Sequence, residues 1–423
     1  MFRAHFTSTS PVPLSDVVID FLEQAKEWSK QGPVAIDIML FSFTSQDIYD
    51  SLLALSKIRN VQIRILADWG NISKDNERKT AVLADLRTPK IKVKYKFDQP
   101  YNWDLERDRL QWSYHASLGL LHHKTIQISL NGIPKKLLTG SFNWTKKGVH
   151  NYENILEIEN KDQASNDVIS AFAYEFKALW NHPDLSLNPA QARMHFAQVK
   201  QFYQIDKQRT ALQFLDSLKS GQSLNDERIP PADRETKITD LYVAFSGSHP
   251  FKNWRNMGFA ARNAWRYFDM TKASGLKKRV PLGLSTVALD VIFSADETSE
   301  LCLCMYAISQ RVPEYGALLN AARKGISVRM ILDLEANEQI IGVIKEKIAQ
   351  EDLPIQIRAG VRGMHQKYLL DTANGNLVTG TANMSTDASD RHAEHRFLFR
   401  KNKEVVEQFR KDFETIWDRL APK

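Results

Sequence analysis

The feature that most constrains the fold of this 423-residue chain is an internal repeat. One block, residues 121–153, contains LHHKTIQIS, a turn and LLTGSFNWTKKGVHNYE. A second block, from Met364 onward, contains MHQKYLLD and then LVTGTANMSTDASDRHAEHRFLF. Both blocks have H-x-K, then G-[ST]-x-N, then a glutamate, in the same order. A match of this kind indicates duplication rather than chance, so we predict two halves that fold alike.

The repeat extends upstream and downstream of the two blocks. VAIDIMLFSFTS matches LCLCMYAIS, and VQIRILAD aligns with ISVRMILD without a gap; these apolar runs predict buried strands. Both halves end in a similar helical stretch, SNDVISAFAYEFKALW or KEVVEQFRKDFETIW. The N-terminal FRAHFTST is expected to be a strand that corresponds to VALDVIFSADE at 287–297. Strands that alternate with helices predict two similar α/β/α sandwich halves with mixed sheets.

We place the first half at residues 1–184 and the second at 284–423. Residues 185–283 connect them and do not repeat. The later part of this connecting region mixes aromatic and basic side chains. That mixture fits a helix docked by an aromatic stripe, or a surface that binds an anionic partner. A Trp- and Tyr-rich loop at 97–120 precedes the first block and is expected to be either a wall or lid of the site or a packed surface loop.

The residues shared by the two blocks form a candidate site for an oxygen-rich anion. His122 and Lys124 are two residues apart, so on an extended backbone their side chains share a face, and His365 and Lys367 repeat them. Small polar residues after each glycine turn supply hydrogen-bond donors for phosphate oxygens, and a glutamate can accept the other ring proton of an imidazole. These residues are Ser141, Asn143 and Glu153 in the first half and Thr381, Asn383 and Glu394 in the second.

Other polar residues near the blocks have a structural interpretation. His123 is expected to face away from the side that His122 shares with Lys124. Asp68 and Asp333 each end a predicted buried strand and are expected to cap the following segment. Four further histidines either line the pocket or lie on the surface without a role, and we favour the surface for His115, His150, His392 and His395.

The doubled H-x-K and G-[ST]-x-N pattern resembles the phospholipase D superfamily, the HKD phosphodiesterases. The resemblance covers both halves but not the connecting region. It implies that the halves meet at a pseudo-twofold axis and build one active site in a single chain, so that a monomer suffices. It also implies a reaction that needs neither metal ion nor cofactor, in which one histidine attacks phosphorus to form a phosphohistidine while the other protonates the leaving oxygen.

The resemblance also suggests roles for the site residues. His122 is the expected nucleophile and His365 the expected acid, although the residues alone do not separate the two roles. Glu153 and Glu394 would fix the imidazole tautomers. Charge on the phosphate would be compensated by Lys124, Lys367, Asn143 and Asn383. The expected substrate contacts are Ser141, Thr381 and Trp144.

The chain departs from the family pattern at one place in each half. The family has an aspartate seven residues after each histidine, where this chain has Ser129 and Thr372. Asp371 lies one residue short, so on an unbroken strand it faces the opposite way from position 372. Because the family aspartate is supportive and lies outside the proton relay, we still expect activity.

Composition bears on the compartment. The sequence shows no secretory signal and no apolar run of the roughly 18 residues that span a bilayer. Cys302 and Cys304 lie in one apolar strand and are expected to be core residues in a reducing compartment. We therefore expect a cytoplasmic protein, with secretion by a signal-independent route left open.

Charge bears on the substrate. A net charge of +7 favours an anionic partner, either nucleic acid or a phospholipid membrane surface. GSFNWT in the first block resembles the small HKD nucleases, so a nuclease is the favoured interpretation. The alternatives are phospholipase D-type hydrolysis or transphosphatidylation of phospholipids, and an HKD relative that binds nucleic acid without catalysis.

Overall fold

The computed structural model describes most of both halves and little of the region between them. The described residues are 2–72, 83, 86, 88–96, 101–104, 109–112, 120–146, 148–181, 186–194, 240–246, 284–360, 363–385, 388 and 392–420. Of the loop at 97–120, they include a hairpin of β5 (Tyr101–Asp104) and β6 (Arg109–Trp112) and the residue at 120. The expected wall or lid and the aromatic-basic part of the connecting region otherwise lie outside the described residues.

The first half contains an eight-stranded mixed sheet in the order β1-β9-β8-β7-β2-β3-β4-β10. Its strands are β1 (Phe2–Phe6), β2 (Val34–Leu40), β3 (Val61–Asp68), β4 (Ile91–Lys96), β7 (Lys124–Leu130), β8 (Ile133–Gly140), β9 (Asn154–Glu159) and β10 (Ser186–Leu187). The central strand β2 pairs in parallel with β3 and antiparallel with β7, and β7 carries the first H-x-K block into the middle of the sheet.

The second half repeats the first seven strands of this sheet in the same order, and its described residues include no counterpart of β10. Its seven strands lie in the order β11-β17-β16-β15-β12-β13-β14. They are β11 (Leu241–Phe245), β12 (Glu300–Met305), β13 (Ser327–Asp333), β14 (Ile355–Gly360), β15 (Lys367–Asp371), β16 (Asn376–Gly380) and β17 (His395–Phe399). Here β12 pairs in parallel with β13 and antiparallel with β15, as β2 does with its neighbours. The predicted repeat and the mixed sheets are confirmed.

The start of the second half differs from the prediction. Residues 287–297, expected to be a strand, lie mostly in the helix α9 (Leu284–Ser294). The strand that corresponds to β1 is β11, inside the region assigned to the connection, and it pairs antiparallel with β17 as β1 pairs with β9. The error arose because VALDVIF is almost continuously apolar, and such a run does not distinguish a buried helix from a buried strand.

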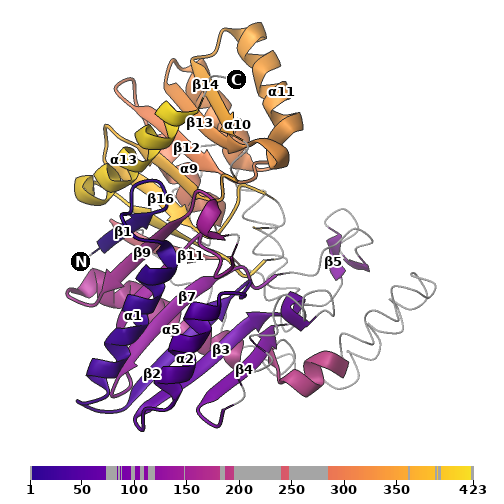
Figure 1. Ribbon diagram of the computed structural model, residues 1–423. Helices are drawn as coiled ribbons and strands as arrows, with labels where there is room; N and C mark the ends of the chain where they lie inside the picture. The colour runs from indigo at the N-terminus through magenta and orange to yellow at the C-terminus, as the bar shows by residue number, and fades with distance from the viewer. Residues whose placement is uncertain are drawn as a thin grey trace.

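Helices cover both faces of each sheet. In the first half α1 (Leu14–Trp28) packs beside α2 (Gln46–Ser56), and in the second α9 packs beside α10 (Pro313–Arg323). A further helix, α11 (Leu334–Glu351), packs on β13 and β14. The last helix of each half, α5 (Gln163–Trp180) or α13 (Lys403–Arg419), also contacts the edge strand of the other half, β11 or β1. Figure 1 shows the halves one above the other, with α13 next to β1 at their boundary.

Three apolar clusters follow from this layering. Because neighbouring strand residues point to opposite faces, Leu138 joins a cluster within the first half while Leu137 joins a cluster shared by both halves. In β12, Leu303 belongs to the cluster of the second half, whereas Cys302 and Cys304 belong to the shared one. The cysteines are free and fully buried, as predicted. The shared cluster fixes the halves to each other and so sets the geometry where their repeated blocks meet.

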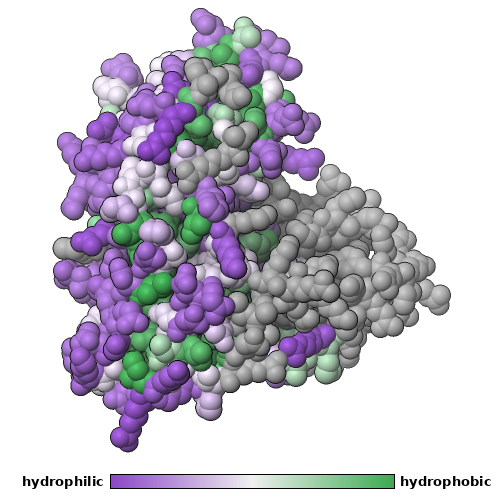
Figure 2. All heavy atoms as spheres, in the orientation of Figure 1, coloured by the Kyte–Doolittle hydropathy of each residue, from purple (hydrophilic) through white to green (hydrophobic). Residues whose placement is uncertain are grey.

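The described outer surface is mostly polar. Figure 2 shows hydrophilic residues over much of the described part of this face, with apolar residues scattered between them. Among the described residues, no helix combines the length and the apolar character that crossing a bilayer requires.

Candidate active site where the two halves meet

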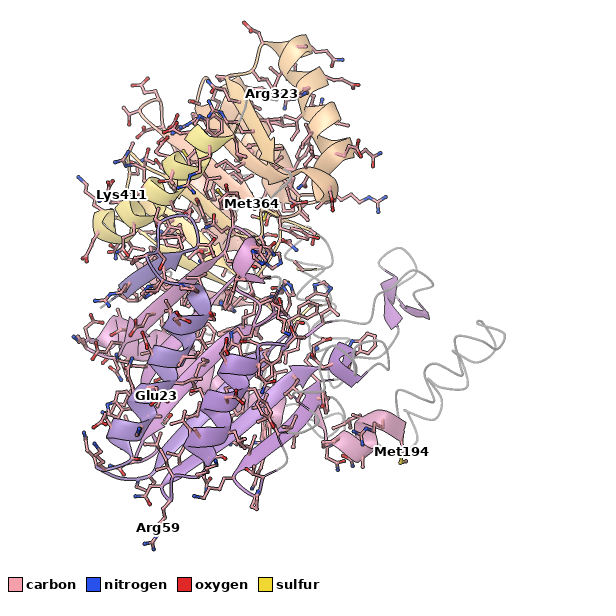
Figure 3. The ribbon with its side chains drawn as sticks, in the orientation of Figure 1. Glu23, Arg59, Met194, Arg323, Met364 and Lys411 are labelled. Atoms are coloured by element: carbon pink, nitrogen blue, oxygen red, sulfur yellow. The ribbon has the colours of Figure 1, made fainter. Side chains whose placement is uncertain are left out.

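Backbone pairing joins the repeated blocks directly. The N–H of His122 donates to the carbonyl of Ala393 (3.0 Å), and the N–H of His365 donates to the carbonyl of Tyr152 (3.0 Å). Ala393 and Tyr152 immediately precede the two glutamates, so each histidine is held beside the glutamate of the opposite half. Figure 3 labels Met364, the residue before His365, close to the boundary of the two halves.

Each histidine is paired with a glutamate across this boundary. His122 Nδ1 lies 2.8 and 2.9 Å from the two carboxylate oxygens of Glu394. His365 Nδ1 lies at the same two distances from the oxygens of Glu153. All four side chains are nearly or fully buried, and the two imidazole centroids are 6.5 Å apart. A carboxylate at Nδ1 keeps a proton there and leaves Nε2 as the reactive nitrogen of each neutral ring.

A lysine lies beside each histidine. Lys124 Nζ donates to the carbonyl of His122 at 2.8 Å, and Lys367 Nζ makes the matching bond to His365. Burial lowers the pKa of Lys124 to about 7 and that of Lys367 to about 8, against the attraction of the nearby carboxylates. Two ammonium groups enclosed together therefore bind their protons weakly until a negative ligand compensates them.

Burial also acts on the imidazoles and their partners. It lowers the pKa of His122 and of His365, with the two lysines acting in the same direction and the paired glutamates opposing it. Burial alone would raise the pKa of Glu394, but its contacts with His122 and His392 hold that pKa well below the usual range. The site is thus a buried cluster of neutral imidazoles, two lysines and the glutamates that pair with the imidazoles. Its lysines hold their protons more firmly when an anion binds beside them.

An aromatic ring that the sequence analysis missed lies behind each Lys–His pair. The Phe41 ring is 5.3 Å from Lys124 Nζ and meets the His122 ring edge-on at 4.9 Å. The Tyr306 ring is 5.2 Å from Lys367 Nζ and 5.1 Å from the second imidazole. Both aromatic residues directly follow matching strands, β2 and β12. The alignment of IDIMLFSFT with LCLCMYAIS carried this signal, because it places Phe41 on Tyr306.

The chain's relationships agree with this arrangement. A family model described as "Cardiolipin synthase, PLD-like domain" matches residues 18–180 and 289–417, well over half of the chain. This protein belongs to the phospholipase D superfamily. The two matched ranges contain most strands of the two sheets, although β1, β10 and β11 lie outside them, and the break between the ranges includes the connecting region.

Three similar proteins illustrate the superfamily. Mitochondrial cardiolipin hydrolase of Mus musculus is 25% identical over 165 residues, which is 38% of this chain and 60% of that relative's length. Phosphatidylserine synthase of Haemophilus influenzae shares the fold, with a TM-score of 0.56 at 10% identity over 96% of this chain and 86% of that one. Nuc of Salmonella typhimurium, described as a phospholipase D family member, is 15% identical over 43% of this chain and 97% of that one, with a TM-score of 0.31.

A hydroxyl side chain holds the backbone of each glutamate in this superfamily member. The N–H of Glu153 donates to Thr7 Oγ1, and the N–H of Glu394 donates to Ser246 Oγ, both at 2.9 Å. Thr7 directly follows β1, and Ser246 directly follows β11. The sequence analysis missed both residues because it aligned FRAHFT with 287–297 instead of LYVAFS at 241–246.

Two predicted substrate contacts hold the next backbone N–H. Ser141 Oγ accepts from the N–H of Asn154 (2.9 Å), and Thr381 Oγ1 accepts from the N–H of His395 (3.1 Å). Both hydroxyls are fully buried. The structure thus shows an anchoring role for them and leaves contact with substrate as a prediction.

The asparagines and the tryptophan of the G-[ST]-x-N blocks differ in whether their side chains are free to contact a ligand. Asn143 and Asn383 are half-buried, and among the described residues neither Oδ1 atom has a hydrogen-bond partner. Trp144 instead packs on Phe43, with ring centroids 5.7 Å apart, inside the apolar cluster of the first half. A role of the two asparagines at the phosphate stays a prediction, whereas Trp144 has a place in the core.

The two strand-terminal aspartates do cap the following segments, as predicted, and they also fix the histidines. Asp68 accepts from a backbone N–H two residues on (2.8 Å), and Asp333 caps α11. The second oxygen of Asp68 accepts from the N–H of Leu121 (2.8 Å), and that of Asp333 accepts from the N–H of Met364 (3.1 Å). Leu121 and Met364 directly precede the paired histidines, so the same carboxylate organises two segments at once.

Ser129 and Thr372 occupy the two positions where the family pattern has an aspartate. Ser129 is buried on β7, and Thr372 lies in the turn after β15. Asp371 bonds within that turn, where its carboxylate accepts from the side-chain amide of Asn374 (2.9 Å). Within the described part of the chain, His, Cys, Asp and Glu side chains form no group of three that would hold a metal ion.

The remaining histidines depart in part from the predictions. His123 faces away from the site, as expected, and its Nδ1 lies 2.9 Å from Nδ1 of His395. The surface prediction for His395 is wrong: it lies on β17, between β16 and β11, and is fully buried. His150 is exposed, as predicted, and His115 lies outside the described residues.

His392 is also wrongly predicted as a surface histidine. Its side chain is 13% exposed, and its Nδ1 lies 3.5 Å from a carboxylate oxygen of Glu394. Its ring centroid is 6.0 Å from that of His122. The sequence did contain a hint of this position, because His392 lies two residues before the motif glutamate Glu394. The hint was missed because the corresponding residue of the first half is Asn151, which is not a histidine.

Proposed function

We propose that this protein is a metal-independent phosphodiesterase that works through a phosphohistidine. The observation that carries the proposal is the crossed arrangement of the site. Two imidazoles lie 6.5 Å apart, and each is held through Nδ1 by a carboxylate of the other half. Phosphodiester cleavage needs a nucleophile, a general acid and positive charge at the phosphate oxygens. The imidazoles supply the first two, and the adjacent lysines supply the third.

In the first step, Nε2 of His122 attacks phosphorus, an N–P bond forms, and the P–O bond to the leaving group breaks. His365 takes up a second proton when the anionic phosphodiester binds, because the phosphate and Glu153 both stabilise the imidazolium, and it gives the proton on Nε2 to the leaving oxygen. In the second step a water attacks phosphorus and gives a proton to His365 as the N–P bond breaks. Both histidines return to their starting state. The non-bridging oxygens are held by Lys124, Lys367, Asn143 and Asn383.

For the substrate we propose nucleic acid. The support is the net charge of +7, since a polyanion gains from long-range attraction as well as from the local lysines. Phospholipid is the second candidate, because the matching family model is described as a cardiolipin synthase and the mouse relative is named a cardiolipin hydrolase. Both substrates present the same phosphodiester to the same pair of histidines.

The test is a phosphodiesterase assay in the presence of EDTA, with single-stranded DNA, duplex DNA, RNA, and vesicles of phosphatidylglycerol or cardiolipin. Because nucleophile and acid are each essential, His122→Ala and His365→Ala should each lose at least about 10³-fold in kcat/KM. His150→Ala, at an exposed histidine near the first block, should retain full activity.

The outcomes separate the candidates. EDTA-resistant cleavage of a nucleic acid that both variants abolish supports the nuclease. Release of a lipid headgroup under the same controls overturns the nucleic-acid assignment and supports phospholipid as the substrate. Binding of a substrate without turnover by the wild type overturns the phosphodiesterase proposal.

A further inference from the structure

The two halves of the site are nearly equivalent, with one chemical difference in the contacts of their glutamates. Glu394 contacts two imidazoles, those of His122 and His392. Glu153 faces His365, and the residue two positions before it is Asn151. A third imidazole therefore accompanies one histidine of the pair.

The backbone holds His392 where it is. Ser246 Oγ donates to the carbonyl of His392 (2.5 Å) and accepts from the N–H of Glu394 (2.9 Å). One serine thus fixes both residues of the contact. In the first half Asn151 occupies the matching position, and its Oδ1 lies near Gly363, where an added Cβ would be 2.8 Å away. The contact between His392 and Glu394 is therefore held in place by the fold of the second half.

The other charges around the cluster do not distinguish the two catalytic histidines. Lys124 and Lys367 both oppose protonation of His122 and both oppose protonation of His365. Each histidine has one glutamate that favours its protonation. The remaining carboxylates that face the cluster, Asp68 and Asp333, act on the lysines and occupy matching positions in the two halves.

We propose that His392 is a positioning residue that shares Glu394 with His122 and thereby adds to the effect of burial, which keeps His122 unprotonated and ready to attack phosphorus. A carboxylate that accepts a hydrogen bond from a second imidazole, or faces its positive charge, has less negative potential left to stabilise a proton on the first. Among the described residues, the Glu153 side chain contacts one imidazole, that of His365, which therefore retains its proton more easily. The difference in partners therefore suits one ring to act as nucleophile and the other as acid.

The roles of the two rings rest on the proposed function, whereas the effect of His392 on His122 does not. The primary test is therefore an NMR pH titration of isotope-labelled imidazoles in the full chain, comparing wild type with His392→Asn. Asparagine is chosen because it occupies the matching position of the first half. The His122 resonance is assigned by its absence in His122→Gln, and His150→Asn serves as a control for the loss of a histidine outside the cluster.

Removal of His392 should move the His122 titration to higher pH by about one unit, the size of effect that a single hydrogen-bonded neighbour has on a buried group. His365 should titrate as in the wild type, and His150→Asn should change neither. An unchanged His122 titration in His392→Asn overturns the proposal, even if the variant melts at a lower temperature, because a purely structural role lowers stability without moving that titration.

The pH dependence of kcat/KM gives a second readout. Since the nucleophile must be neutral, the acid limb of the wild-type profile should move up by the same amount in His392→Asn, while the alkaline limb, which reports the acid, stays in place. An acid limb that does not follow the NMR shift overturns the assignment of His122 as nucleophile. If the wild type cleaves no substrate, the proposed function fails, and the NMR titration still decides the role of His392.

Discussion

Lys124 and Lys367 show how burial alone prepares a site for an anion. Enclosed together, they hold their protons far less tightly than an exposed lysine does. The aromatic faces of Phe41 and Tyr306 behind them contribute cation–π attraction, and the nearby carboxylates raise the lysine pKa values, but the two together do not offset burial. A bound phosphate adds further negative charge, so binding and protonation must be coupled.

Anion affinity should therefore depend on pH in a defined window. Sulfate is a suitable probe because it resembles phosphate in shape and remains a dianion throughout. Its affinity, measured by calorimetry, should be constant below pH 7 and fall as pH rises through the lysine pKa values of about 7 and about 8. The fall should approach roughly tenfold per pH unit for each proton that binding restores. Lys124→Met should weaken binding and remove the component near pH 7, whereas an affinity independent of pH contradicts the coupling.

Single site residues could be predicted from the sequence where the same residue type occurs at matching positions of both halves. His, Lys, Asn and Glu recur in both blocks, and the histidines, lysines and glutamates of both halves meet at one place. His392, Thr7 and Ser246 were missed for two reasons. His392 has a different residue at the matching position, and the two hydroxyls follow strands whose alignment was wrong. Trp144 was expected to contact substrate because it adjoins a motif asparagine, but it packs on Phe43 in the core of the first half.

At the level of elements, the glycines that end β8 and β16 bring adjacent strands unusually close. A Cβ on Gly140 would lie 2.2 Å from the carbonyl oxygen of Asn154, and a Cβ on Gly380 would lie 2.2 Å from that of His395. Those two carbonyls directly follow the site glutamates. The motif glycine is therefore required by the close passage of the segment that carries each carboxylate.

Gly140→Ala and Gly380→Ala should each destabilise the fold by about 1–3 kcal/mol, because backbone must move to admit the methyl group. Each should also reduce phosphodiesterase activity, since the displaced strand carries a glutamate that holds a histidine. Urea unfolding and kcat/KM provide the two measurements. Gly342→Ala, in α11 with nothing within 4 Å of the added methyl, should instead stabilise by about 0.5–1 kcal/mol. Equal effects at all three glycines would contradict the close-passage argument.

The elements themselves were largely predictable, and their exceptions have physical reasons. The strands of the first half and the terminal helices alternate or repeat clearly in the sequence. The segment 287–297 did not, because an apolar run enclosed by the sheet and a neighbouring helix loses the polar face that reveals its period. Edge strand β11 was hidden for another reason: it is short, and its partner β17 lies about 150 residues away along the chain, beyond any local pattern.

At the level of the whole molecule, one buried carboxylate links the halves away from the site. Asp412, on α13 of the second half, accepts from the hydroxyl of Ser8 in the first half and from that of Tyr368 (2.8 Å). Burial raises the pKa of Asp412 to about 6, although these hydrogen bonds oppose the change. The junction between the halves thus contains a charge that is unfavourable near neutral pH.

This gives a prediction for stability against pH. Between about pH 4 and 6 the folded protein binds more protons at Asp412 than the unfolded chain does, so its contribution to the free energy of unfolding falls as pH rises through that window. Above pH 6 the buried charge costs up to about 3 kcal/mol. Asp412→Asn should therefore raise the free energy of unfolding at pH 8 by about 1–3 kcal/mol and have little effect at pH 4.5.

Urea unfolding at the two pH values provides the measurement. Asp418→Asn, at an exposed aspartate on the same helix, is the matched control and should change neither value appreciably. An Asp412→Asn protein that is less stable than wild type at pH 8 would show that the carboxylate is favourable where it lies.

The crossed pairing of histidines and glutamates also affects when the site comes into existence. His122 and Glu394 are 272 residues apart, and Glu153 and His365 are 212 apart. During translation, no imidazole can meet its own carboxylate until residue 365 has been added, and the second pair waits for residue 394. A ribosome that stalls after the first half releases a chain with a histidine, a lysine and a glutamate but with no matched pair among them. The proposed chemistry is thereby tied to completion of the second half, which withholds phosphodiester cleavage from truncated products.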